Sequence, residues 1–354
     1  MRRNHNYYIN LAFQLAERNL GLTGLNPSVG SVLIKNETLI SSGVTSKTGR
    51  PHSEFNALNK TKNCSGATLY TSLEPCTHYG KTPPCSNIIV QKKIKSVYYA
   101  FEDPDIRTFK KAKQILRKKG IIVKLIRTKL YKKFYRGYFI NKKFNIPYIS
   151  GKIALSKDNL TINKKKEWIT NDSSRKVVHL LRYKHDCILS TSKSINYDNS
   201  LLNCRIEGID KYKPDLFIID LNLNLKKNLS LNKLIGKRKT YLVTNIINLK
   251  KTFIYKKLGY KIILIKSLDT KKDFISLYKK IYKIGYSRVF VESGLTFINT
   301  LIKNKLIHDL YIFKSDKKLN SNGKNNISSN CLKKFLSKPI TINLNGDKLY
   351  KQEF

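Results

Sequence analysis

The chain has 354 residues, too many for one ordinary compact domain, and this length predicts about two domains. Hydrophobic residues make up 41% of it, enough for sizeable cores, which excludes a chain that is disordered throughout. It contains no run of 18 or more apolar residues, so a membrane-spanning helix is excluded, and the broken apolar stretch over 11–16 makes a secretory signal unexpected.

The net charge of +46 raises the possibility of nucleic-acid binding. The lysines are spread over the whole length, however, and they accompany abundant Asn, Ile and Tyr, the amino acids of A/T-rich codons. A genome-wide bias therefore explains much of the excess, and an anionic small substrate or cofactor fits the charge equally well. The six cysteines are few and irregularly spaced, so we expect a reducing, cytoplasmic setting and no disulfide framework.

The first 127 residues alternate helix-like and strand-like segments. They are a helix over 7–19, a hairpin over 29–42, strands over 67–73 and 96–101, a basic helix over 109–119 and a strand over 121–126. This alternation is typical of a layered α/β domain. We expect this domain to span 1–127 and a polar, basic connector to span 128–145.

A second α/β pattern starts at Ile146 and predicts a domain over 146–354. Its predicted strands are 148–155, 186–191, 215–220, 239–244, 261–266, 288–292 and 310–314, and its helices are 172–184, 271–284 and 295–304. The chain contains no G-x-G-x-x-G, so a dinucleotide bound here would not use that fingerprint.

One histidine and two cysteines of the first half have the neighbours of a catalytic metal site. His52 stands two residues before Glu54, Cys76 follows Glu-Pro, and Cys85 follows Pro-Pro. One imidazole and two thiolates suit Zn²⁺, and three protein ligands leave a fourth position for a water whose pKa the metal lowers. Glu54, at the start of a predicted helix, is placed to move protons without binding the metal. The order H-x-E then P-C is typical of zinc deaminases that act on nucleobases.

Structural roles for these residues are the alternative, because a lone His near a loop is usually structural and most cytosolic cysteines are inert. The ordered combination favours zinc. Cys64 has no partner near it in the sequence and is left out, and His78 is not assigned to the metal. The residues between Cys76 and Cys85 include Lys81, which can meet an anion.

Three segments of the first half resemble the deaminase half of the bifunctional riboflavin biosynthesis deaminase/reductase family. They are 26–30 (N-P-S-V-G), 51–54 (P-H-S-E) and 73–85, whose G-K-T-P-P-C stretch separates this family from cytidine and tRNA adenosine deaminases. Residues 102–105 look like the family's D-P-N-P segment, with Asp105 in place of Asn and without the glycines that usually follow. The resemblance implies a cytidine-deaminase-like three-layer α/β/α domain, in which Asn26 orients the base and Lys81 meets the phosphate.

The resemblance continues over five segments of the second half, namely 152–159, 167–170, 179–182, 190–205 and 291–294. It implies a dihydrofolate-reductase-like α/β domain with NADPH as hydride donor. The residues on cofactor-contact positions are Ala154, Trp168, Ser194, Asp198 and Gly294. Those on substrate positions are Arg182, Leu202, Arg205 and Glu292. The backbone N–H groups after Gly294 and the two arginines are also donors suited to phosphate.

The resemblance therefore predicts two reactions in riboflavin biosynthesis. The first is zinc-dependent hydrolytic deamination of 2,5-diamino-6-ribosylamino-4(3H)-pyrimidinone 5′-phosphate, and the second is NADPH-dependent reduction of the ribosyl group to ribityl. We expect a small-molecule substrate and a homodimer.

Three observations leave alternatives open. A lone Trp is more often a core residue than a ring platform, and a Gly before a helix is often only a turn. The +46 charge favours a nucleic-acid base deaminase with a C-terminal binding module. Thr191 and Lys193 replace glycines of the family, and a lysine run over 164–166 stands in a shortened loop, which supports a deaminase with an inactive reductase domain.

Overall fold

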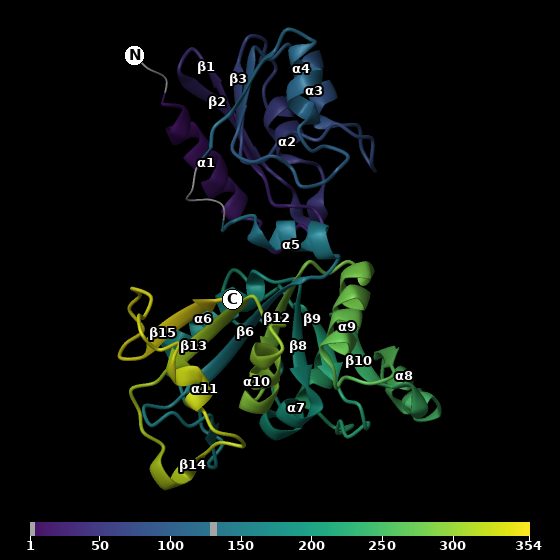
Figure 1. The fold of residues 1–354 in the computed structure, drawn as a ribbon, viewed down its shortest axis with the longest axis vertical. Coiled ribbons are helices and arrows are strands. Elements are labelled where there is room, and N and C mark those ends of the chain that lie inside the picture. Colours follow the sequence, from purple (N-terminus) through teal and green to yellow (C-terminus); the bar gives the residue numbers. More distant parts are fainter. Residues whose placement is uncertain (1–3, 128–132) are drawn as a thin grey trace. The chain divides into compact units, whose positions relative to one another are not determined.

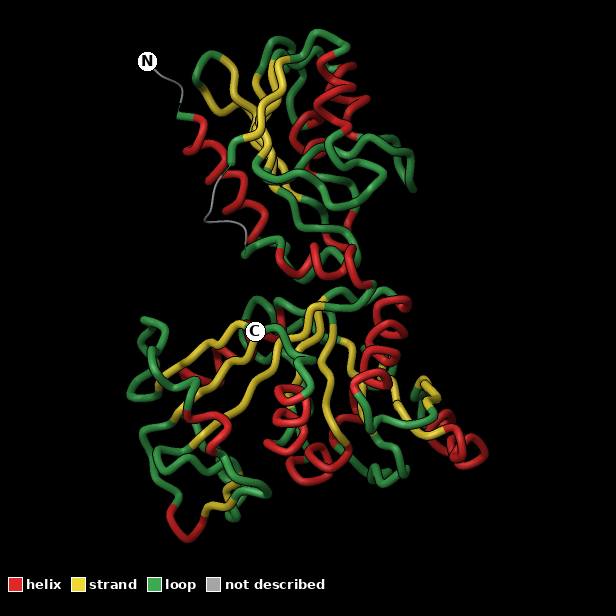
Figure 2. Tube along the Cα trace, in the orientation of Figure 1, coloured by secondary structure: helices red, strands yellow, loops and turns green. Residues whose placement is uncertain are grey.

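The computed structural model describes residues 4–127 and 133–354, which divide into two compact units, Met1–Asn145 and Ile146–Phe354. In each unit helices cover both faces of a sheet (Figures 1 and 2), as the α/β fold class predicts. Of the predicted connector, 128–132 lie outside the described residues, and 136–144 form a helix that belongs to unit 1. Within the described residues, no helix combines the length and apolarity needed to cross a membrane.

Unit 1 holds a five-stranded sheet in the order β2-β1-β3-β4-β5, with β1 antiparallel to both neighbours and β3, β4 and β5 parallel. Its strands are β1 (Gly30–Lys35), β2 (Thr38–Val44), β3 (Thr68–Thr71), β4 (Ser96–Tyr99) and β5 (Ile122–Leu125). Its helices are α1 (His5–Glu17), α2 (Ser53–Asn59), α3 (Cys85–Gln91), α4 (Lys111–Arg117) and α5 (Arg136–Phe144). The predicted hairpin turns at Asn36 and Glu37, both with positive φ, which matches the twist of paired strands.

The two faces of this sheet carry separate apolar clusters. Leu58, Ile89 and Leu116 come from α2, α3 and α4 and pack on one face. Helix α1 packs on the other face so closely that a Cβ on Gly30 would lie 1.9 Å from the Ala12 carbonyl oxygen. Only glycine permits this approach, which brings the 26–30 segment against α1.

Unit 2 holds an eight-stranded sheet in the order β11-β10-β9-β8-β12-β6-β13-β15, parallel except for the β13–β15 pair. Its strands are β6 (Tyr148–Leu155), β8 (Cys187–Thr191), β9 (Asp215–Ile219), β10 (Thr240–Asn245), β11 (Lys261–Ile265), β12 (Arg288–Glu292), β13 (Asp309–Lys314) and β15 (Lys348–Glu353), with a separate ribbon of β7 (Ile162–Asn163) and β14 (Gly323–Lys324). Its helices are α6 (Asp172–Tyr183), α7 (Ser192–Asp198), α8 (Phe253–Lys257), α9 (Lys271–Ile284), α10 (Leu295–Lys303) and α11 (Asn330–Lys333).

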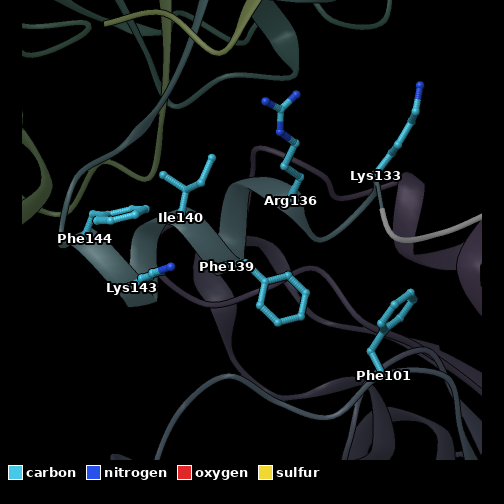
Figure 3. A pocket seen from close by; sticks show the side chains of 7 residues that line it. All are labelled: Phe101, Lys133, Arg136, Phe139, Ile140, Lys143 and Phe144. Atoms are coloured by element: carbon cyan, nitrogen blue, oxygen red, sulfur yellow. The ribbon is translucent and has the colours of Figure 1, made fainter. Parts of the chain in front are cut away.

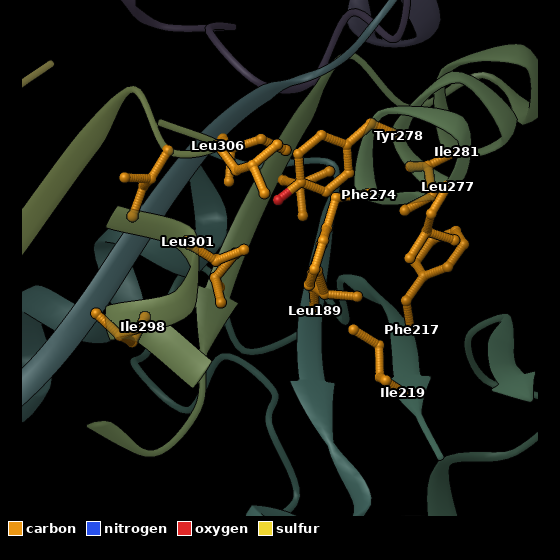
Figure 4. Packing of buried hydrophobic residues seen from close by; sticks show 14 of the residues in the cluster. Leu189, Phe217, Ile219, Phe274, Leu277, Tyr278, Ile281, Ile298, Leu301 and Leu306 are labelled. Atoms are coloured by element: carbon orange, nitrogen blue, oxygen red, sulfur yellow. The ribbon is translucent and has the colours of Figure 1, made fainter. Parts of the chain in front are cut away.

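The core of unit 2 shows why its strands are apolar runs. Phe274, Leu277 and Ile281 of α9 meet Leu189 and Phe217 of the sheet on one face (Figure 4). A second cluster, with residues of α7 and α8, covers the other face. A parallel sheet covered on both faces has no solvent side, so its strands do not alternate. The carboxyl ends of β8, β9, β10 and β12 meet at one edge, where α/β proteins bind ligands.

Helix α5 lines a cavity of about 520 Å³ in unit 1. Phe101, Phe139, Ile140 and Phe144 supply its apolar lining, and three basic side chains complete it (Figure 3). This lining includes none of the residues that the sequence singled out.

Candidate active sites

His52, Cys76 and Cys85 converge from three segments of unit 1. His52 immediately precedes α2, Cys76 lies in the loop after β3, and Cys85 opens α3 behind Pro84. The His52 Nδ1 lies 3.5 Å from the Sγ atom of each cysteine, and the three ligand atoms lie within 4.8 Å of one another. Within the described ranges this is the one such cluster of three or more metal-binding side chains. One nitrogen and two sulfurs suit Zn²⁺ with a position left open.

The two thiols differ in acidity. A hydrogen bond with the Cys85 side chain, followed by one with His52, lowers the pKa of Cys76 to about 4. The Cys85 backbone N–H, at the start of α3, also donates to the Cys76 Sγ at 3.2 Å. The hydrogen bond with Cys76, followed by burial, instead raises the pKa of Cys85. The thiolate is the form of cysteine that binds metals, so of the two thiols only Cys76 favours the ligating state without a cation.

Glu54 is buried beside this cluster, with 4% of its surface exposed. The Ser53 hydroxyl donates to its Oε2 at 3.0 Å, and Ser53 is itself 2.8 Å from the Ser31 hydroxyl of β1. Burial raises the pKa of Glu54, and the charge of His52 opposes the rise. A carboxyl with a raised pKa binds a proton more readily than an ordinary one, which suits a group that takes and returns protons.

Asn26 lies next to the loop that leads into His52. Its amide Nδ2 donates to the Gly49 carbonyl at 3.0 Å. Gly49 has φ +93, and a Cβ there would come within 2.7 Å of the same Nδ2, so the loop requires glycine. The 26–30 segment therefore helps to fix the approach to His52.

The insert between the two cysteines lies at the surface, and Lys81 is exposed on it. The Arg50 guanidinium contacts the Thr82 hydroxyl, which brings a second cation to this insert. Arg50 was missed from the sequence, although its place two residues before His52 was a signal.

Glu74, in the segment that leads to Cys76, fixes the loop over 102–112. Its carboxylate accepts backbone N–H bonds from Asp103, Lys110 and Ala112, each at 3.1 Å. Lys110 has φ +60, so a lysine takes the left-handed backbone where the family's glycines are missing. The loop is thus held by Glu74 without those glycines.

Helix α5 makes hydrogen bonds and an ion pair to the loops around the His52, Cys76 and Cys85 cluster. The Tyr138 hydroxyl donates to the Asp103 carboxylate at 3.0 Å, and the Lys142 ammonium donates to that of Asp105 at 2.9 Å. Arg107 binds Asp105 through two bonds, which, with Lys142, holds the pKa of Asp105 well below its usual range. The Tyr135 hydroxyl, just before α5, donates to the Ser28 carbonyl at 3.2 Å. None of these contacts was expected from a connector.

In unit 2, Arg182 and Glu292 form a buried, two-bond ion pair. Nε and Nη2 of Arg182 lie 2.5 and 3.0 Å from the two Glu292 oxygens, and the Lys152 ammonium lies 3.6 Å from Oε2. Arg182 was expected to grip a substrate phosphate, but its guanidinium is directed at Glu292 and at the Asn203 carbonyl. Arg205, which is exposed, is the better phosphate donor of the two.

Ser194 and Gly294 meet at the sheet edge. The Gly294 N–H donates to the Ser194 hydroxyl at 3.1 Å. The Ser293 hydroxyl lies 3.2 Å from that of Ser194 and 2.9 Å from that of Thr191. Thr191, which replaces a glycine of the family, thus joins a group of hydroxyls at the start of α10, beside free N–H groups suited to a phosphate.

The other sequence-predicted residues of unit 2 differ in exposure, and Asp198 lies near enough to Lys152 and Glu292 for their charges to act on it. Trp168 is 66% exposed and stacks on the Arg175 guanidinium at 5.3 Å, so the alternative that it is a core residue is wrong. Ala154 is half-buried in β6, Asp198 ends α7, and Leu202 is buried in the following loop with φ +47.

Fold and sites together define a hydrolytic deaminase of the cytidine-deaminase class joined to a dihydrofolate-reductase-like unit. Residues 2–101 match the model for the cytidine and deoxycytidylate deaminase zinc-binding region, and 147–317 match the RibD C-terminal domain. The riboflavin biosynthesis protein RibD of Buchnera aphidicola is 30% identical over 335 residues, covering 90% of this chain and 88% of that protein. The chain belongs to the RibD family of riboflavin biosynthesis proteins.

Two further relatives agree. RibD of Bacillus amyloliquefaciens is 31% identical over 319 residues, covering 87% of this chain and 83% of that protein. The structure of Acinetobacter baumannii RibD superposes with a TM-score of 0.84 at 26% identity, covering 99% of this chain and 98% of that one. The chain therefore combines a zinc-binding deaminase domain and a reductase domain of riboflavin biosynthesis, and neither the nucleic-acid deaminase nor the inactive reductase is favoured.

Proposed function

We propose that unit 1 deaminates 2,5-diamino-6-ribosylamino-4(3H)-pyrimidinone 5′-phosphate and that unit 2 then reduces the ribosyl group with NADPH. The observation that carries the proposal is the His52, Cys76 and Cys85 cluster with buried Glu54 beside it. Bound Zn²⁺ supplies a Lewis acid that lowers the pKa of a water. Glu54 takes one proton from the attacking water and delivers it to the ring nitrogen, and it then passes the second proton, from the hydroxyl that results, to the departing amino group. The amino group leaves as ammonia and an oxo group replaces it.

The remaining residues of unit 1 orient the substrate. Asn26 holds the base, and Lys81, with Arg50 near it, meets the phosphate. The support is their position, because Asn26 adjoins the loop into His52 and the insert of Lys81 joins two metal ligands in the sequence.

In unit 2, NADPH when bound supplies the hydride that reaches the ribose C1 and opens the ring. We assign the nicotinamide dinucleotide to the sheet edge formed by Ser194, Gly294 and the residues that follow, with Ala154, Trp168 and Asp198 as further contacts. Arg205 and Leu202 hold the pyrimidine ribotide, and Arg182 orients Glu292 toward it. The support is the hydroxyl group around Ser194 and the two-bond pair of Arg182 and Glu292.

Mass spectrometry of the diaminopyrimidinone ribotide tests both activities. Zinc-loaded protein should exchange the amino group for oxo without NADPH and should add two hydrogens with it. Exchange alone in both samples would contradict the reductase assignment. No change in either sample, with zinc content verified, would contradict the whole proposal and would favour the nucleic-acid alternative, which filter binding against salt tests directly.

A cytoplasmic setting and a homodimer are further parts of the proposal. All six cysteines are free, which fits a reducing compartment. Sedimentation equilibrium of the whole chain tests the dimer, and a monomer at micromolar concentration would contradict it.

A further inference from the structure

Arg238 is a buried arginine two residues before β10. Only 7% of its surface is exposed. Its Nη1 donates to the Leu202 carbonyl at 2.5 Å and to the Pro214 carbonyl at 3.3 Å. Its Nη2 donates to the Leu201 carbonyl at 2.8 Å. Both Nη atoms of the guanidinium therefore bind backbone carbonyls, and most of these carbonyls lie in the loop over 201–205.

The next carbonyl of that loop is held by a second buried guanidinium. Nη1 of Arg182 donates to the Asn203 carbonyl at 2.7 Å, while its other nitrogens bind Glu292. Two arginines thus hold three consecutive carbonyls. Between them Leu202 has φ +47, a left-handed backbone that leucine rarely adopts. Such a conformation persists only where its surroundings enforce it, and here the two guanidinium groups do so.

We propose that Arg238 is a positioning residue for the pyrimidine ribotide in the reductase unit. It holds the loop over 201–205 in the conformation that presents the exposed Arg205 to the substrate and keeps Leu202 buried, without touching the substrate itself. The inference rests on the proposed function, because that function makes this loop a substrate contact. Arg182 joins the same loop to Glu292, so both proposed substrate elements depend on one set of bonds.

The test compares Arg238→Met, Arg238→Lys and the control Lys237→Met in the full chain. Lys237 is the exposed neighbour, so its change removes the same charge without touching the loop. Arg238→Met should raise the reductase KM for the pyrimidine ribotide about tenfold, the effect of losing about one hydrogen bond from a charged group. The KM for NADPH and the rate of deamination should not change. Arg238→Lys, which keeps the charge but loses the fork, should raise the same KM by a smaller factor.

A purely structural role would lower the active fraction, and hence the apparent kcat, without a selective change in one KM. An unchanged ribotide KM in folded Arg238→Met, or an equal rise in both KM values, would overturn the inference. If Arg238→Met does not fold, Arg238→Lys decides, and a wild-type ribotide KM in it would also overturn the inference. Absence of reduction in the wild-type chain would instead contradict the proposed function.

Discussion

The two sites of this chain are built by different means. The deaminase site joins reactive groups: an imidazole, a carboxyl and one thiol at helix starts, and a second thiol in the loop after β3. The reductase site consists mainly of side chains that bind one another, such as the Arg182–Glu292 pair and the hydroxyls around Ser194. In the proposed function, side chains of the first unit move the protons themselves. In the second unit the cofactor would carry the hydride, and the protein would mainly orient the substrate.

This difference predicts that single changes act differently in the two units. Substitution of a reacting side chain in unit 1 should abolish deamination without unfolding the protein. Substitution of a side chain that positions others in unit 2 should change the stability of the unit or the KM of reduction as well as its rate.

The largest effect is expected from Glu54→Gln, which removes the proton shuttle. Deamination should fall by about 10²–10⁴-fold, zinc content should remain at one equivalent, and reduction of the deaminated intermediate should be unaffected. Ammonia release and atomic absorption measure the first two. The control is Glu17→Gln, an exposed carboxyl at the end of α1. Normal ammonia release by Glu54→Gln would refute its role as shuttle.

Arg182→Met should leave the Glu292 carboxylate buried and without its two-bond partner. Removing one member of such a pair costs about 3–5 kcal/mol of unfolding free energy. Hydrogen exchange of β6 and β12 should rise, while exchange in unit 1 should not. The exposed Lys184 at the end of α6 provides the control change, Lys184→Met. Equal exchange in the two variants would show that the pair adds nothing to the stability of unit 2.

The same pair predicts an acid dependence. Burial alone would raise the pKa of Glu292, but the charges of Arg182 and Lys152 outweigh it and lower this pKa to about 2. A lowered carboxyl pKa stabilises the folded state above the unfolded pKa of about 4.3, and the stabilisation is lost as pH falls from there toward 2. Hydrogen exchange of β12 measured across this window should accelerate in the wild type more steeply than in Glu292→Gln. Parallel profiles would count against the lowered pKa.

The smallest effect is expected from Tyr138→Phe, which removes the hydroxyl that binds Asp103. A net loss of about 1 kcal/mol would raise the KM for deamination about fivefold and leave reduction unchanged. Steady-state kinetics of both activities measure this, with Tyr7→Phe on the exposed side of α1 as control. Equal deamination KM values in the two variants would mean that α5 does not support the substrate loop.

The sequence predicted the reacting residues of unit 1 better than the positioning contacts of unit 2. The zinc cluster was found because its ligands carry characteristic neighbours, His-x-Glu and Glu-Pro-Cys, within one short stretch each. The parallel strands of both sheets were found because buried parallel strands are apolar runs. The short helix α7 was missed, since seven residues directly after β8 give no helical periodicity. β15 was missed because it is an edge strand with exposed polar positions.

The contacts that no sequence pattern reveals are those between distant positions. Arg182 and Glu292 are 110 residues apart, so nothing local shows that one neutralises the other. Arg238 has no motif around it, and its role depends on the fold bringing it to Leu202. The partners of Asp105 are similar, because Lys142 lies in a segment that was assigned to a connector. Sequence motifs therefore do not reveal side chains that bind distant backbone groups or buried charged residues.

Helix α5 shows at which residue the chain could be divided into two separately expressed proteins. Asn145, with left-handed backbone, ends the helix immediately before the second compact unit begins at Ile146. A cut after 127 would separate the deaminase from Tyr135, Tyr138 and Lys142, which bind its loops at Ser28, Asp103 and Asp105. A deaminase expressed without its reductase should therefore need the chain as far as Asn145.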